Sequence, residues 1–167
     1  MSCLGVHFAL TQDDATALEA IEDDDARLEY VTEEIEARYF EEAEAYVAES
    51  DKSWDAMHRA LSDGTLSWTG GAYPLNHVVL GGRSLYSNDD YIMSLKTPAQ
   101  VRDIAAALEP IGEAEFRQLY NNINAKNYDG DISDEDFEYT WTWFVGVKDL
   151  YAKASAEGRF VLFTADQ

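Results

Sequence analysis

The stretch Leu4-Gly5-Val6-His7-Phe8-Ala9-Leu10 places an apolar residue at every second position, which predicts a β-strand with one fully apolar face. Phe160-Val161-Leu162-Phe163 is a continuous apolar run, short enough to be a buried strand. A buried strand needs a neighbour on each side, so both runs are expected inside one sheet. The predicted fold class is α/β of the α+β type, with a small mixed sheet that contains both terminal strands and about five or six covering helices.

Capping residues and apolar periodicity predict where the helices lie. Thr97-Pro98-Ala99-Gln100 combines an N-cap, a proline at the first helical position and a glutamine three residues after the cap. Ser133 is expected to cap a long helix that reaches Ala156. The segment from 65 to 90 is rich in turn formers, and short strands are expected at 77–80 and 91–95. The remaining helices are predicted at 12–21, 25–49, 51–62, 97–108 and 113–120. Because no repeat or low-complexity linker interrupts residues 1–167, one domain is expected.

The charge of the chain limits its partners. It has 33 acidic and 12 basic side chains, a net charge of −21, and residues 1–50 alone carry 15 acidic and 2 basic side chains, net −13. Nucleic acids and anionic membranes are bound through Lys and Arg, so neither is an expected partner. A basic protein is the partner class that this charge favours, while a solvated acidic surface that only confers solubility explains the same composition.

Cysteine content and the apolar runs indicate the compartment. Cys3 is the only cysteine, which excludes an intramolecular disulfide and a thiolate zinc cluster. Every apolar run is far shorter than the roughly 20 residues that span a bilayer. The first residues also lack the basic segment and cleavage site of a secretory signal, so a cytoplasmic location is expected.

Four segments in order resemble the YfbM-like family over nearly the full length. They are Asp51-Lys52-Ser53-Trp54 with His58, Asn76-His77-Val78-Val79-Leu80-Gly81-Gly82, Thr97-Pro98 through Val101-Arg102, and the Phe160–Phe163 run. The resemblance implies a small α/β fold of the bacterial cytoplasm. The family is of unknown function, so it supplies no catalytic residues for this chain.

His58 is the strongest candidate for catalysis. On a helix it lies one turn from Trp54 and within reach of Asp55, so a carboxylate could fix its tautomer beside a pocket wall. An aromatic–histidine pair that packs on the sheet explains the same residues. Gly81-Gly82 is followed by the donors Arg83 and Ser84, but no helix begins there, and tight turns explain the glycines better than a phosphate loop. The candidate binding residues are therefore Trp54, Arg83 and Ser84, and the candidate catalytic residues are His58 and Asp55.

Metal binding has weaker support. Residues 125–136 match part of the EF-hand template, but Ala125 cannot ligate at position 1 and Asp136 replaces the glutamate of position 12. The three histidines, His7, His58 and His77, show no metal-binding spacing. No metal and no cofactor are therefore expected.

The leading hypothesis is a non-catalytic interaction protein for a basic partner, like an inhibitor or immunity protein, and the alternative is a small enzyme with a pocket at His58 and Trp54.

Overall fold

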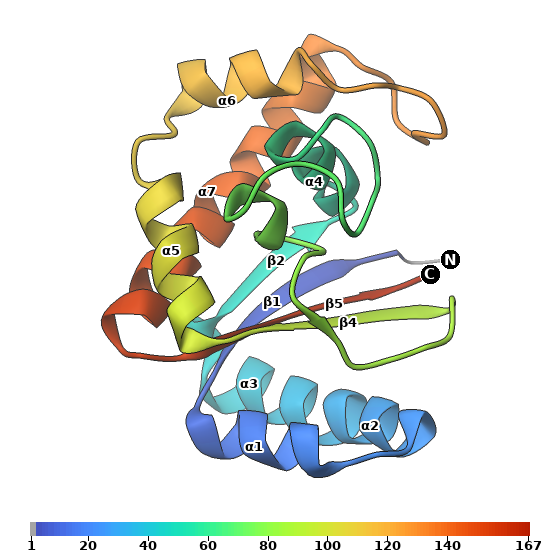
Figure 1. Cartoon of the computed structure of the whole chain (residues 1–167), viewed down its shortest axis with the longest axis vertical. Helices are drawn as coiled ribbons and strands as arrows, with labels where there is room; N and C mark the ends of the chain where they lie inside the picture. The colour runs from blue at the N-terminus through green and yellow to red at the C-terminus, as the bar shows by residue number, and fades with distance from the viewer. Residues whose placement is uncertain (1–2) are drawn as a thin grey trace.

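The computed structural model describes residues 3–167. In this part of the chain one sheet has the strand order β2-β1-β5-β4-β3 (Figure 1). Strands β1 and β5, from the two apolar runs, pair inside the sheet, which confirms that expectation. The four pairings are all antiparallel, so the prediction of a mixed sheet was wrong in this detail. The strands are β1 (Gly5–Leu10), β2 (Val47–Asp51), β3 (Arg83–Ser84), β4 (Tyr91–Lys96) and β5 (Phe160–Asp166).

Helices cover both faces of the sheet because alternate side chains of each strand point to opposite faces. Phe8, Leu10 and Leu162 pack in the same core cluster as Leu18 and Ile35. These contacts attach α1 (Gln12–Ala20), α2 (Asp24–Tyr30) and α3 (Glu36–Glu42) to one face, below the sheet in Figure 1. The opposite face carries α4 (Trp54–Leu61), α5 (Pro98–Leu108), α6 (Glu113–Tyr120) and α7 (Asp134–Ala156).

The predicted caps of α5 and α7 are present. Thr97 Oγ1 accepts a hydrogen bond from the Gln100 backbone N–H at 3.3 Å, and Gln100 Oε1 accepts one from the Thr97 N–H at 2.9 Å. Ser133 Oγ accepts a hydrogen bond from the Asp136 N–H at 3.1 Å. Local capping chemistry therefore fixes where both helices begin. Across residues 3–167, no helix combines the length and apolar character that a membrane span requires.

The long acidic helix predicted at 25–49 is confirmed as far as Glu42 and is wrong beyond it. Helix α2 passes through a π-helical turn, Val31–Ile35, into α3, which ends at Glu42. A short 3-10 helix, Glu44–Tyr46, then leads into β2. β2 pairs with β1, where Phe8 lies opposite Val47 and His7 opposite Ala48. β5 pairs with only one edge of β1, so without β2 the backbone groups on the other edge of β1 would lack partners. This tertiary contact overrides the helical periodicity of the segment.

The strand expected at 77–80 is also wrong, because this segment is a buried turn after the 3-10 helix Leu75–His77. Its backbone carbonyl oxygens point to donors on other elements. Val78 O accepts hydrogen bonds from His7 Nε2 at 2.8 Å and from Tyr151 Oη at 2.7 Å. Lys96 Nζ donates to Val79 O, and Ser94 Oγ donates to Leu80 O at 2.8 Å. We call these four side chains, His7, Ser94, Lys96 and Tyr151, the carbonyl clamp.

Lys96 generates a prediction about alkaline stability. Its side chain is fully buried, and burial lowers the pKa of its amine well below the usual 10.5. Below pH 10.5 the Lys96 amine is protonated in the unfolded chain but stays neutral in the folded chain. Stability is therefore lost as pH falls toward the pKa of Lys96 in the folded chain. From about pH 7.5 to about pH 9.5, we expect the free energy of unfolding to rise by up to about 1.4 kcal/mol per pH unit.

Urea denaturation of Lys96→Met tests this prediction. The variant should lack the alkaline slope, so its deficit relative to the wild type should widen as pH rises. Lys126→Met, at an exposed lysine, is the control and should leave the slope unchanged. Parallel curves for the wild type and Lys96→Met would show that Lys96 stays protonated in the fold.

Candidate functional site

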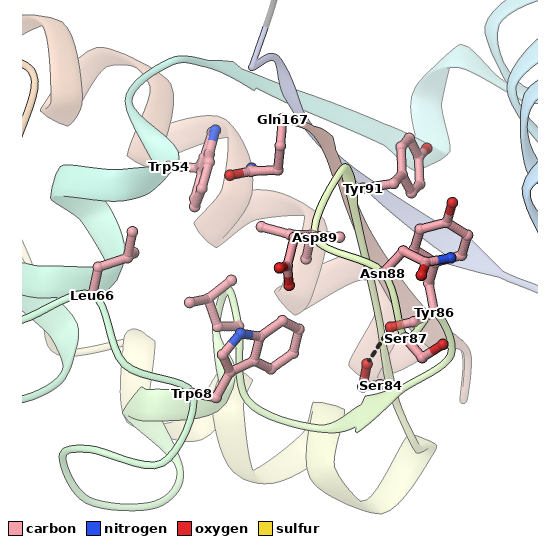
Figure 2. Close-up of a pocket in the computed structure, with 12 residues that line it drawn as sticks. Trp54, Leu66, Trp68, Ser84, Tyr86, Ser87, Asn88, Asp89, Tyr91 and Gln167 are labelled. Carbon is pink, nitrogen blue, oxygen red and sulfur yellow. Dashed lines mark hydrogen bonds between the residues drawn. The ribbon is translucent and has the colours of Figure 1, made fainter. Parts of the chain in front are cut away.

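A groove of two adjoining pockets lies beside Trp54 and Gln167. Both pockets are lined by Trp54, Leu66 and Gln167. We call the first, of about 450 Å³, the tryptophan pocket, and the second, of about 660 Å³, the aspartate pocket. The tryptophan pocket (Figure 2) is completed by Trp68, Leu80, Ser84, Tyr86, Ser87, Asn88, Asp89, Tyr91 and Ile92. The aspartate pocket is completed by Cys3, Lys52, Asp55, Asn127, Tyr128, Asp129, Gly130, Asp136 and Tyr139.

Trp54 is fixed between the two pockets by contacts on several sides. Its indole Nε1 donates a hydrogen bond to Cys3 O at 2.8 Å, and its ring lies 5.8 Å from the Phe163 ring, centroid to centroid. A Cβ at Gly5 would lie 2.7 Å from Trp54 Cδ1, so glycine at this position of β1 leaves the space that the indole occupies. Trp54 is 4% exposed and can present only an edge to the groove.

His58 holds the loop that forms one wall of the groove. Its Nε2 lies 2.6 Å from Ser67 O, and because a carbonyl only accepts, Nε2 carries the proton. Ser67 stands between Leu66 and Trp68, which are each 41% exposed and line the tryptophan pocket. The histidine therefore acts on the groove indirectly, by fixing the backbone between two wall residues.

Arg59 holds the facing loop in the same way. Its guanidinium donates to the carbonyls of Asn124 and Lys126, both at 2.9 Å, and to that of Asn127 at 3.1 Å. It also lies over the Tyr128 ring, 5.4 Å from the centroid. Since Asn127 and Tyr128 line the aspartate pocket, this buried cation determines the shape of that pocket.

The expected pairing of Asp55 with His58 is not formed. Asp55 Oδ1 instead accepts from Arg59 Nε at 2.5 Å, and His58 Nδ1 is buried without a hydrogen-bond partner. His58 is fully buried and lines neither pocket of the groove. The structure thus brings Trp54 and Asp55 to a pocket but leaves His58 behind its wall, so the geometry does not support a general base at His58.

The candidate binding residues Arg83 and Ser84 take separate positions. Ser84 lines the tryptophan pocket, where its hydroxyl donates to Tyr86 O at 3.1 Å (Figure 2). Arg83 does not line that pocket and forms an ion pair with Glu19 at 2.5 Å. Of the two, only Ser84 belongs to the groove.

Carboxylates give the aspartate pocket a negative field. Burial raises the pKa of Asp55 and outweighs the effect of Arg59, and Asp129 and Asp136 raise it further. Asp136 accepts hydrogen bonds from the hydroxyls of Tyr120 at 2.6 Å and Tyr128 at 2.9 Å. The last residue of the EF-hand-like segment therefore bonds to two tyrosines.

The three histidines do not converge on one point. His7 contacts Val78, His58 contacts Ser67, and His77 Nδ1 lies 2.7 Å from Asn76 Oδ1. Among residues 3–167, no group of three or more His, Cys, Asp or Glu side chains is placed to hold a metal ion.

Several groove residues were not predicted from the sequence. Leu66, Trp68 and Asp89 lie in the segment that was interpreted as loops, where periodicity carries no information about exposure. The one available signal was the presence of large apolar residues, Leu66 and Trp68, within a stretch of turn-forming residues.

Comparison with known proteins places the fold. A family model described as a domain of unknown function, DUF1877, matches residues 1–164. The chain belongs to this family. It is also similar to the solved structure of YfbM from Escherichia coli, a protein of unknown function, with a TM-score of 0.59 and 19% identity over 97% of this chain and 99% of that chain. At this identity the likeness shows the fold alone. Comparison with curated proteins gives no match.

In this DUF1877 domain, Trp54 should contribute strongly to stability. Its indole packs in the core cluster of the α4 and α7 face, and truncation also removes its partly buried hydrogen bond to Cys3 O. We expect Trp54→Ala to reduce the free energy of unfolding by about 3 to 5 kcal/mol. Chemical denaturation measures the loss, and a value below about 1 kcal/mol would mean that the indole contributes little packing in solution.

The buried histidines predict a loss of stability in mild acid. Burial lowers the pKa of His7 to about 3, with a further contribution from Lys96, and that of His58 to about 4, against 6.5 for an exposed histidine. As pH falls from 6.5 toward 4, both histidines therefore become protonated in the unfolded chain but stay neutral in the folded chain. The stability present above pH 6.5 should be lost with a slope approaching about 2.7 kcal/mol per pH unit.

His58→Gln separates this effect from that of the carboxylates. Glutamine keeps a donor for Ser67 O but cannot be protonated. The slope of the unfolding free energy against pH should therefore fall by about 1.4 kcal/mol per pH unit in the variant. Burial raises the pKa of Glu36, which acts in the opposite direction. If wild-type stability instead rises between about pH 6.5 and about pH 4.5, relief of carboxylate repulsion outweighs the histidines.

Proposed function

We propose that this protein is a non-catalytic binding protein of the bacterial cytoplasm whose acidic face attracts a basic protein partner, in the manner of an inhibitor or immunity protein. The observation that supports this most directly is the set of exposed carboxylates on the segment from 22 to 44, whose two arginines bond to groups outside that set. Nucleic acid and membranes are disfavoured as partners by the net charge of −21.

The acidic face follows from how this segment packs. Val31, Ile35 and Tyr39 are buried against the sheet, so the remaining sides of the helices face solvent. In Figure 1 these helices form the layer below the sheet. The exposed carboxylates on this layer are Glu22, Asp23, Asp25, Glu29, Glu33, Glu34, Glu41, Glu42 and Glu44.

The two arginines of this segment are used inside the fold. Arg27 donates to Leu85 O at 2.9 Å and to Glu19 O at 3.3 Å. Arg38 pairs with both carboxylate oxygens of Asp14, at 3.1 and 2.9 Å. Since 22–44 contains no other basic residue, its surface carboxylates lack cationic partners from their own segment.

Such a face accelerates association with a cationic protein over distances of about 8 Å at physiological salt. Charge alone gives rate and selectivity more than affinity, which comes from buried aromatic and apolar contacts. The groove supplies those contacts, because Leu66 and Trp68 are exposed at its wall. The proposal therefore assigns attraction to the acidic face and tight contact to the groove.

Salt-dependent capture tests the role of the acidic face. The immobilised protein should retain a basic protein from bacterial lysate at about 50 mM salt and release it at about 0.5 M, where the screening length shrinks to roughly 4 Å. Glu33→Gln/Glu34→Gln should weaken binding of the purified partner a few-fold, mainly by slowing association.

The matched control removes the same charge from the opposite side of the sheet. Glu109→Gln/Asp149→Asn alters exposed carboxylates that adjoin α5 and lie on α7. This variant should bind like the wild type. Retention of no partner, retention that salt does not change, or equal losses in both variants would contradict the proposal.

A further inference from the structure

The tryptophan pocket combines aromatic rings with one carboxylate and no basic side chain. Its described lining contains the rings of Trp54, Trp68, Tyr86 and Tyr91, and Asp89 is its single charged side chain. The aspartate pocket differs, because Lys52 lines it and Arg59 already pairs with Asp55. A cation can therefore enter the tryptophan pocket without meeting a charge of its own sign.

Asp89 is the group in this pocket that is free to bind. It is exposed, and none of the hydrogen bonds or ion pairs of the described chain involves its carboxylate. In Figure 2 its side chain extends toward the space between Trp54 and Trp68. The loop that carries it is anchored by a different carboxylate, because Asp24 accepts hydrogen bonds from the backbone N–H and the hydroxyl of Ser87. Asp89 thus has no structural task in the loop.

Aromatic faces attract cations through the ring quadrupole, and tryptophan does so most strongly. A planar guanidinium stacks on such a face and pairs with a carboxylate at the same time, which a compact ammonium does less well. The volume of about 450 Å³ accommodates a long side chain and the adjoining peptide backbone. The lining therefore matches the chemistry of arginine.

We propose that the tryptophan pocket receives an arginine side chain, with the guanidinium stacked on Trp68 and paired with Asp89. The identification of the arginine as part of a protein partner rests on the proposed function, whereas the chemistry of the pocket does not. Trp68 is 41% exposed, and stacking would cover it.

A capped peptide with one arginine in an otherwise neutral sequence is the probe, and the same peptide with citrulline is its neutral counterpart. The four tryptophans give separate indole N–H signals in a nitrogen–proton NMR spectrum. Trp54 and Trp68 line the pocket, while Trp141 and Trp143 on α7 do not and serve as internal references. We expect the arginine peptide to shift the Trp68 signal saturably and the citrulline peptide to cause no saturable shift. The same peptide with lysine in place of arginine should bind more weakly.

Two variants at exposed positions test the assigned contacts. Asp89→Asn removes the charge and keeps the shape, and Trp68→Ala removes the stacking surface. Each should weaken binding of the arginine peptide about three- to tenfold, measured for Trp68→Ala from the Trp54 signal. Asp131→Asn, which removes an equal charge from an exposed loop position outside both pockets, should leave binding unchanged. Equal shifts with citrulline, or equal effects of Asp89→Asn and Asp131→Asn, would overturn the inference.

The outcome is separable from that of the capture experiment. Glu33→Gln/Glu34→Gln lies outside the pocket and should not change binding of the short peptide. If the peptide binds but no basic protein is captured, the arginine pocket is supported and the proposed role of the acidic face is contradicted. If a basic protein is captured but the peptide does not shift the Trp68 signal, the proposed role of the acidic face is supported and the arginine pocket is contradicted.

Discussion

The backbone carbonyls of the buried turn from Val78 to Gly81 impose the main constraint on this structure. A buried carbonyl without a donor costs about 1 to 3 kcal/mol, and none of the strand pairings in residues 3–167 includes the backbone of this turn. The carbonyl clamp provides the donors from three elements at once: His7 on β1, Ser94 and Lys96 on β4, and Tyr151 on α7. The turn therefore joins the sheet to its helical cover, and a Cβ at Gly81, 2.4 Å from Asn76 O, would push it out of place.

The same use of side chains to satisfy irregular backbone shapes the groove. Leu80, at the clamped turn, forms part of the tryptophan pocket. His58 fixes the carbonyl between two wall residues, and Arg59 fixes three carbonyls of the facing loop. Both residues are buried on α4, one turn after Trp54. One short helix thus presents the central indole and also positions both loops that flank it, which explains how a groove made largely of turns keeps a defined shape.

Sequence reasoning succeeded where structure is local. The caps at Thr97 and Ser133 and the two apolar strands depend on residues within a few positions of one another. It failed where a distant partner decides the outcome, as at β2, which forms because β1 offers an unpaired edge. The Asp55–His58 pairing failed for a related reason: helical spacing allows several neighbours, and the guanidinium of Arg59, one residue further along, is the stronger partner for a carboxylate. The groove was only partly predictable, because Asp89 lines a pocket together with residues that are distant from it in the sequence, such as Trp54 and Gln167.

The acidic surface and the irregular interior are linked through the scarcity of cations. The chain has 12 basic side chains against 33 acidic ones, and several of the 12 donate to backbone carbonyls. Such contacts are made by the charged side chains of Arg27, Arg59, Lys148, Lys153 and Arg159. Arg59 and Arg159 also pair with Asp55 and Glu157, so the cations held by carbonyls neutralise few of the 33 acidic side chains. Solubility alone would require a net charge of only a few units in a domain of this size. A fold that holds several of its cations against carbonyls therefore leaves its outer helices negative, and this uncompensated charge is the feature on which the proposal of a basic partner rests.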